Sequence, residues 1–200
     1  MFSGIIQAVG VIEKLEPLAA GVRLTIEAGA LGLGDAKVGD SIAVNGACMT
    51  ATSIDGSRFT VDVSRESLEV TAGLGAPGRV NLEKAMALGD RIDGHLVTGH
   101  VDGIGEVTAF EQLGESWRLE VRAPAELGRY IARKGSITVD GVSLTVNRVE
   151  DRPQGAVFEV NLIPHTLQVT TLLRLAPGAK VNLEIDLVAR YLERILSAAK

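Results

Sequence analysis

Short runs of alternating or β-branched apolar residues follow one another along the chain, separated by polar breaks rich in Gly, Asp and Pro. Six such runs lie in the first half: Ile5–Glu13, Val22–Ala28, Ser41–Asn45, Met49–Ile54, Arg58–Val63 and Arg79–Glu83. Runs of this kind are typical of β-strands. Six short strands in about 95 residues predict a small closed barrel, because closure removes exposed sheet edges.

The connections between the strands carry turn and helix signals. Asn45-Gly46 resembles the two-residue turn of a type I′ hairpin, and Asp140-Gly141 repeats that signal in the second half. Short helices are predicted over Ala30–Leu33, Glu66–Ala72, Ala125–Ala132 and Thr166–Leu172.

The end of the chain has a different pattern, with a helical period. One face of this helix is apolar and contains Leu187, Val188, Tyr191, Leu192, Ile195 and Leu196. The opposite face carries Arg190, Glu193, Arg194 and Lys200. Such a helix either packs back on its own barrel or contacts another subunit. The subunit contact is favoured, because the helix lies outside both halves and has no core of its own to complete.

An internal repeat organises the chain. Residues 41–50 and residues 136–145 agree at a spacing of 95 residues, with identical Ser, Ile, Val, Gly and Thr positions. Two later blocks align in the same order: 59–63 with 158–162, and 80–83 with 181–184. The residues added between the blocks fall beside turns, as expected for a duplicated fold that keeps its strands.

The repeat divides the chain into two barrels rather than one large domain. We predict an N-terminal barrel over residues 1–94, a C-terminal barrel over residues 95–187 and a helical segment for oligomerisation over residues 188–200. The predicted fold class is all-β, a tandem duplication of six-stranded barrels with a C-terminal helix. The duplication also implies two similar pockets suited to small molecules.

Composition and charge narrow the class of protein. The 200 residues are 46% hydrophobic and 22% charged, which excludes a disordered chain. The net charge of −5 and the scattered basic residues argue against nucleic-acid binding. No apolar stretch suits a membrane span, and the first residues lack a signal-peptide pattern, so a cytoplasmic location is expected. Cys48 is the single cysteine, which excludes an intramolecular disulfide and a multi-cysteine metal site.

His95 and His100 lie at the junction of the two halves. Their spacing places them on opposite faces of a strand and well apart on a helix, so they do not form a metal-binding pair. An imidazole has a pKa of about 6.5, which suits proton transfer, so His100 is a candidate general acid or base. The alternative is a structural hydrogen-bonding role, which is commoner for a lone histidine between domains.

Matching positions of the repeat carry small polar side chains. Cys48 and Ser143 are equivalent, and each is followed two residues later by a threonine, Thr50 or Thr145. These groups either serve two similar pockets or fill space under a hairpin. Asp186 aligns with an alanine, so its carboxylate either acts as an acid or base or caps the final helix. From these residues alone, an enzyme, a ligand carrier and a structural module all remain open.

Five segments together resemble the riboflavin synthase family: Met1–Ile6, Val44–Thr50, Gly94–Gly103, Lys134–Val146 and Ile163–Leu167. The resemblance runs from residue 1 to the terminal helix and includes a twofold lumazine-binding repeat. It implies two Greek-key barrels and a C-terminal helix, assembled as a homotrimer whose active site lies between the N-terminal barrel of one subunit and the C-terminal barrel of a neighbour. Association with lumazine synthase is a further expectation.

The resemblance also implies a reaction. Two molecules of 6,7-dimethyl-8-ribityllumazine are dismutated to riboflavin and 5-amino-6-ribitylaminopyrimidinedione, because one molecule donates a four-carbon unit to the other. Neither a metal nor a redox cofactor is needed. The rival is a non-catalytic lumazine- or flavin-binding antenna protein that shares the repeat. The intact motif blocks, His100 and Asp186 favour the enzyme.

The resemblance places ligand contacts in both halves. Those in the first half are Gly4, Ile5, Ile6, Cys48, Met49, Thr50, Asp62, Val63, Ser64, Arg65, Glu66 and Ser67. Those in the second half are Gly99, His100, Val101, Lys134, Ser143, Leu144, Thr145, Asn161, Leu162, Ile163, Pro164, His165 and Thr166. The expected catalytic residues are His100, Ser143, Cys48 and Asp186, with Ser41 and Thr145 as secondary candidates. Arg65 and His165 depart from the family's usual residues, which bears on polar contacts to the ligand and not on the fold.

Overall fold

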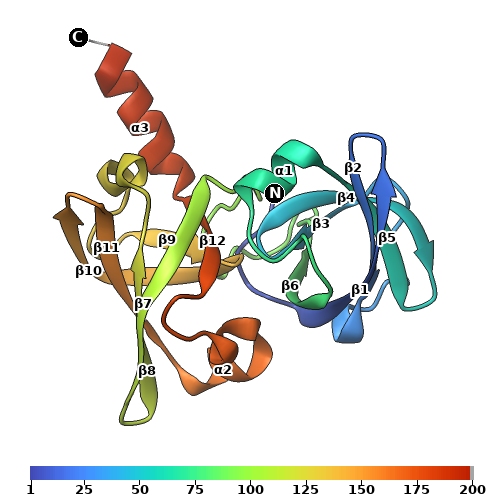
Figure 1. The fold of residues 1–200 in the computed structure, drawn as a ribbon, viewed down its shortest axis with the longest axis horizontal. Helices are drawn as coiled ribbons and strands as arrows, with labels where there is room; N and C mark the ends of the chain where they lie inside the picture. Colours follow the sequence, from blue (N-terminus) through green and yellow to red (C-terminus); the bar gives the residue numbers. More distant parts are fainter. Residues whose placement is uncertain (199–200) are drawn as a thin grey trace.

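Two closed antiparallel barrels lie side by side in the computed structural model, which describes residues 1–198 (Figure 1). The first barrel contains β1 (Ala8–Leu18), β2 (Gly21–Glu27), β3 (Ser41–Val44), β4 (Ala47–Asp55), β5 (Arg58–Ser64) and β6 (Gly78–Lys84). The second barrel contains β7 (Gly103–Leu113), β8 (Ser116–Arg122), β9 (Ser136–Val139), β10 (Val142–Arg152), β11 (Gly155–Leu162) and β12 (Lys180–Ile185). The predicted fold class, a tandem duplication of six-stranded barrels, is confirmed within the described part of the chain.

The strands follow the same order around both barrels. The order is β1-β2-β5-β4-β3-β6 in the first barrel and β7-β8-β11-β10-β9-β12 in the second. The steps from β2 to β5 and from β8 to β11 are Greek-key connections, because strands that are distant in sequence become neighbours. The repeat seen in the sequence is therefore a repeat of the whole topology.

The two predicted hairpin turns have type I′ geometry. Asn45 and Gly46 have φ values of 47° and 82°, and Asp140 and Gly141 have φ values of 48° and 80°. A type I′ turn requires positive φ at both central residues, which explains why these dipeptides occupy it. The flanking residues pair directly across each turn, so the β3–β4 and β9–β10 hairpins have two-residue loops.

Each barrel encloses its own apolar core, built from matching positions. Leu24, Ile26 and Phe59 fill the first core and Leu119 and Phe158 fill the second, all at 1% exposure or less. Burying a side chain of this size contributes roughly 1.5–3 kcal/mol relative to leaving it exposed. The two cores therefore stabilise two separate scaffolds, each of which supports its own binding surface.

The first strand differs most from its predicted range. The pattern predicts a strand over Ile5–Glu13, but β1 begins at Ala8 and continues to Leu18. Residues 5 and 6 leave the barrel, because they belong to a segment that crosses to the second barrel. A β-bulge between Ile12 and Lys14 shifts the register, and β1 then continues to pair with β2.

The short helices lie close to their predicted positions but have tighter or shifted turns. They are the 3₁₀ helix η1 (Gly29–Leu31), α1 (Arg65–Val70), the 3₁₀ helix η2 (Ala125–Tyr130), α2 (Pro164–Val169) and the 3₁₀ helix η3 (Thr171–Arg174). Helix α2 begins earlier than predicted, because Pro164 suits a first helical turn, where its missing N–H is not needed. The helix predicted over Thr166–Leu172 is therefore interrupted, because α2 ends at Val169 and Thr170 caps the separate 3₁₀ helix η3.

Helix α3 (Leu187–Ala198) projects from the second barrel and points away from both barrels (Figure 1). Its apolar side chains are 55% to 67% exposed: Val188, Tyr191, Leu192, Ile195 and Leu196. Residues 199 and 200 of the predicted terminal segment lie outside the described residues. No helix in the described part of the chain is long and apolar enough to cross a membrane.

The tips of the two type I′ hairpins dock the barrels against each other. A Cβ atom on Gly46 would lie 2.7 Å from the backbone nitrogen of Gly141, so the two turns touch through their backbones. Asn182 Nδ2 donates to the carbonyl of Asn45 at 2.9 Å, and Asn81 Nδ2 donates to the carbonyl of Asp140 at the same distance. These exchanged hydrogen bonds relate the barrels by an approximate twofold symmetry.

Candidate functional site

Two lead-in segments, residues 1–7 and residues 95–102, cross between the barrels. They pair with each other through the backbones of Phe2 and Val97, whose N–H groups donate at 2.8 and 3.0 Å. Each segment then lies on the hairpin of the other barrel. The carbonyl of Gly4 accepts from Ser143 N, and the carbonyl of Gly99 accepts from Cys48 N, both at 2.8 Å.

Side-chain packing follows the same crosswise arrangement. Ile6 packs on the core of the second barrel, which includes Leu144, and Val101 packs on the core of the first barrel, which includes Met49. Ile6 therefore packs on the second barrel although it belongs to the first half of the chain. The crossing could not be seen in the sequence, because it depends on contacts between residues far apart in the chain, such as Gly4 with Ser143 and Cys48 with Gly99.

The predicted ligand contacts therefore form two composite groups. We call the first the N-terminal pocket; it combines residues 48–50, 62–67 and 99–101. We call the second the C-terminal pocket; it combines residues 4–6, 134, 143–145 and 161–166. Each pocket takes its wall from one barrel and its lead-in segment from the other half of the chain.

Two buried carboxylates fix the lead-in segments. Glu83 accepts hydrogen bonds from Ser3 N at 2.7 Å, Ser3 Oγ at 2.8 Å and Gly4 N at 3.1 Å. Glu184 accepts from Thr98 N and Thr98 Oγ1 at 2.7 Å and from Gly99 N at 2.9 Å. Burial raises the pKa of both carboxyls, and these hydrogen bonds partly oppose the rise. Sequence reasoning missed both residues, although their matching positions in the repeat were visible.

Ser143 is a half-buried polar group of the C-terminal pocket. Its Oγ lies 2.7 Å from Nδ1 of His95, a histidine that the sequence did not single out for chemistry. A Cβ atom on Gly4 or Gly94 would come within 2.9 Å of the Ser143 Cβ, so both chain segments must carry glycine there. Burial lowers the pKa of His95, and the carboxylate of Asp186 opposes this shift. A neutral imidazole is therefore favoured beside the serine hydroxyl.

Asp186 caps the final helix, which is one of the two roles that the sequence left open. Its Oδ1 accepts from Val188 N at 2.8 Å, and its carbonyl accepts from Arg190 N at 3.2 Å, so it caps the start of α3. Its charge also acts on His95, which connects it to Ser143. Lys134 lies further out, with Nζ 3.2 Å from Asn147 Oδ1 and a φ of 67°.

The N-terminal pocket presents different groups. Cys48 is half-buried and Thr50 is exposed on β4. Arg23 donates to both oxygens of Asp62 at 2.7 and 2.8 Å, and this guanidinium lowers the pKa of the Asp62 carboxyl. Ser64 caps α1, with its Oγ accepting from Ser67 N at 3.0 Å.

Several predicted contacts are core residues instead of exposed ones. The buried side chains are Met49, Val63, Leu144 and Leu162. The exposed members of the predicted set are Ile5, Thr50, Asp62, Ser64, Arg65, Glu66, His100, Lys134, Thr145, Asn161, Ile163, Pro164 and His165.

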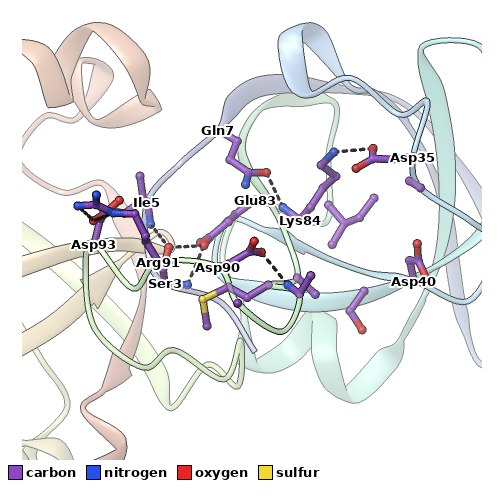
Figure 2. A pocket seen from close by; sticks show the side chains of 17 residues that line it. Ser3, Ile5, Gln7, Asp35, Asp40, Glu83, Lys84, Asp90, Arg91 and Asp93 are labelled. Carbon is purple, nitrogen blue, oxygen red and sulfur yellow. Dashed lines mark hydrogen bonds and ion pairs between the residues drawn. The ribbon is translucent and has the colours of Figure 1, made fainter.

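A hollow of 910 Å³ lies beneath the linker between the barrels (Figure 2). It borders the predicted residues Ile5 and Ser41, but carboxylates in its lining are already paired, as in the 2.7 Å contact of Lys84 with Asp35. It therefore adjoins the C-terminal pocket without coinciding with it. Among residues 1–198, no three His, Cys, Asp or Glu side chains are grouped to hold a metal ion.

Comparison with known proteins decides the family. The chain matches the family described as "Lumazine binding domain" twice, over residues 3–85 and 98–186. It is 48% identical to riboflavin synthase of Mycobacterium tuberculosis, with both chains covered completely. It is 41% identical to riboflavin synthase of Bacillus subtilis, with all of this chain and 91% of the relative covered.

The chain belongs to the riboflavin synthase family. Solved structures of LumP have the same fold: the riboflavin complex superposes with a TM-score of 0.80 at 26% identity, covering 92% of this chain and 99% of LumP. The complex of LumP with flavin mononucleotide gives 0.79 at 25% identity and the same coverage. Because identity to riboflavin synthases is much higher than identity to LumP, the chain is an enzyme of the riboflavin synthase family.

Proposed function

We propose that this enzyme dismutates two molecules of 6,7-dimethyl-8-ribityllumazine to riboflavin and 5-amino-6-ribitylaminopyrimidinedione. The crosswise construction of two equivalent pockets carries the proposal. A reaction between two copies of one substrate needs two similar sites that present their ligands to each other. An enzyme that holds both substrates in a fixed orientation removes the need for a bimolecular encounter. This fixed orientation contributes much of the rate acceleration.

The two pockets that react belong to different subunits of a homotrimer. Helix α3 supports this arrangement, because its exposed apolar side chains Val188, Tyr191 and Ile195 need a partner surface. The residues of α3 also line a shallow apolar groove. Packing of this face between subunits would set the N-terminal pocket of one chain against the C-terminal pocket of the next.

The C-terminal pocket supplies the proton-transfer groups. A neutral His95 accepts the Ser143 proton through Nδ1, and Asp186 stabilises the imidazolium that results. Ser143 Oγ is then able to take a proton from the acidic methyl group of a lumazine or to add to its ring. His100 and Cys48 shape the other pocket, with Ser41 and Thr145 bordering the substrates.

Incubation with 6,7-dimethyl-8-ribityllumazine tests the function, with riboflavin absorbance as the readout. Riboflavin formation supports the proposal, whereas tight binding of the lumazine without product supports the antenna protein instead. Single-turnover kinetics on Ser143→Ala, Asp186→Asn and Cys48→Ser test the roles. Rates close to that of the unmodified enzyme in all three variants overturn the residue assignment and leave the reaction itself in place.

We also propose the domain limits 1–94, 95–187 and 188–200, a cytoplasmic location and association with lumazine synthase. The strands of the two barrels, which span residues 8–84 and 103–185, support the first of these. Co-sedimentation of the two purified enzymes tests the association, and separate sedimentation of the two speaks against it.

A further inference from the structure

The second lead-in segment is held at both ends, and His100 and Val101 lie between the two attachments. Glu184 binds the backbone at Thr98 and Gly99. At the other end, Asp102 N donates to the carbonyl of Leu183 at 2.8 Å, and Asp102 Oδ2 accepts from Ile185 N at 2.9 Å. The position of His100 therefore depends on how firmly Asp102 is fixed.

Gln7 is the repeat counterpart of Asp102 and makes the same two hydrogen bonds. Its N–H donates to the carbonyl of Leu82 at 2.9 Å, and its Oε1 accepts from Lys84 N at 2.9 Å. A neutral amide therefore suffices to attach this position to its barrel. The negative charge of Asp102 has another use.

That charge binds helix α3. Arg190 Nη2 lies 2.7 and 2.9 Å from the two carboxylate oxygens of Asp102. The Asp102 side chain is only 11% exposed and that of Arg190 is 39% exposed, so the pair is shielded from water on one side. The first half of the chain has no helix equivalent to α3, and it has no charge at position 7.

A second polar contact attaches α3 at a different place. Glu193 accepts from Arg129 Nη1 at 2.9 Å and from the Tyr130 hydroxyl at 3.4 Å. These partners belong to η2 of the second barrel and not to the lead-in segment. The two contacts involve different elements. A variant can therefore weaken the attachment of α3 to η2 without changing the contact between α3 and the segment that carries His100.

We propose that Arg190 and Asp102 are positioning residues: their ion pair holds the segment that carries His100 and Val101 against helix α3, and this pair, not the helix as a whole, sets the geometry of the N-terminal pocket. The coupling rests on the proposed function, because it takes His100 and Val101 to be residues that face a substrate. Loss of Arg190 leaves the largely buried carboxylate of Asp102 without its counter-charge. The carboxylate then turns toward water and draws the adjoining residues with it.

Three single variants and one double variant test the coupling in the full-length enzyme. Arg190→Gln and Asp102→Asn are expected to lower kcat about 3- to 30-fold, because small misplacements of groups near the reacting atoms have large effects on rate. Asp102→Asn keeps an acceptor for Ile185 N, as Gln7 does in the first half, so it removes the charge alone. Arg190→Lys is expected to restore most of the rate. The double variant is expected to be no slower than either single variant, because both remove one contact.

Glu193→Gln is the matched control, because it weakens the other attachment of α3. It is expected to leave kcat within about twofold and the oligomer mass unchanged. An equal loss of kcat in Glu193→Gln, or multiplied losses in the double variant, overturns the coupling in favour of a general effect on the helix.

A second readout does not depend on turnover. Nuclear magnetic resonance of the three histidine side chains follows His100 directly, with His165 as an internal reference. Arg190→Gln is expected to shift the His100 resonances and leave those of His165 in place. Unshifted His100 resonances overturn the coupling, even if the enzyme acts on a different substrate from the one proposed.

Discussion

The two barrels share one topology but differ in the groups that can carry charge. Where the first barrel has Asn45, Ala85 and Gln7, the second has Asp140, Asp186 and Asp102. His95, which contacts Ser143, lies at the junction of the two halves. Positions that agree between the halves, such as the glycine turns and the paired glutamates, build and join the barrels. Positions that differ distinguish the chemistry of the two pockets.

The largest expected difference between the two barrels is in the single-turnover rate after substitution of the equivalent residues Ser143 and Cys48. Ser143→Ala is expected to lower the single-turnover rate by about 10²-fold or more, the range typical of lost acid–base help. Cys48→Ser, at the equivalent position, is expected to lower it less than about tenfold, because no histidine contacts Cys48. Rapid mixing with the lumazine measures both rates. Equal losses in the two variants contradict the division of roles between the pockets.

The matched hairpin residues should differ in their response to pH. Burial raises the pKa of Asp140 to about 7, whereas Asn45, which makes the equivalent hydrogen bond, does not titrate. A carboxyl whose folded pKa is raised loses its stabilising contribution as pH rises from its ordinary value toward 7. Asp140→Asn is therefore expected to stabilise the protein at pH 8 by about 2–4 kcal/mol and to have little effect at pH 4.

The converse variant, Asn45→Asp, is expected to destabilise the protein at pH 8 by a similar amount. Urea unfolding at the two pH values measures both changes. A pH-independent effect of Asp140→Asn rules out titration of this carboxyl in the folded protein.

The paired glutamates should behave alike, because they make equivalent contacts. Glu83→Gln and Glu184→Gln each lose part of a three-bond contact and are expected to cost about 1–2 kcal/mol of unfolding free energy. Their effects on ligands should be opposite: Glu83→Gln loosens Gly4 in the C-terminal pocket, and Glu184→Gln loosens Gly99 in the N-terminal pocket. Thermal unfolding and riboflavin titration measure these effects, and weakening of the same pocket by both variants argues against the crosswise assignment.

The smallest expected effect concerns an exposed ion pair. Arg23 and Asp62 are both partly exposed, so Arg23→Gln is expected to leave the unfolding free energy almost unchanged. Its C-terminal counterpart is Arg118, which contacts Glu111 and Glu159 instead. A larger loss in Arg23→Gln, measured by urea unfolding, indicates that the pair has a structural role that its exposure does not suggest.

The sequence predicted the duplication and the barrels because turns and strand patterns are local. Asn45-Gly46 specifies its own hairpin, and alternating apolar residues specify the strands around it. The crossing of the lead-in segments depends on Gly4 meeting Ser143, a contact between residues far apart in sequence, and no local pattern encodes it. Glu83 and Glu184 were not predicted as functional residues, because a carboxylate in a strand ordinarily faces water. In this protein, backbone N–H groups donate hydrogen bonds to both carboxylates.

One mixing experiment tests most directly that two pockets from different subunits act together. Thr50→Arg blocks the exposed wall of the N-terminal pocket, and Thr145→Arg blocks the equivalent wall of the C-terminal pocket. Each variant alone is expected to form no riboflavin. Oligomers that contain both chains, purified after co-expression with two different tags, are expected to recover activity, because an intact N-terminal pocket of one chain meets an intact C-terminal pocket of the other. Mixed oligomers that stay inactive, although each variant is folded and assembled, contradict a site shared between subunits.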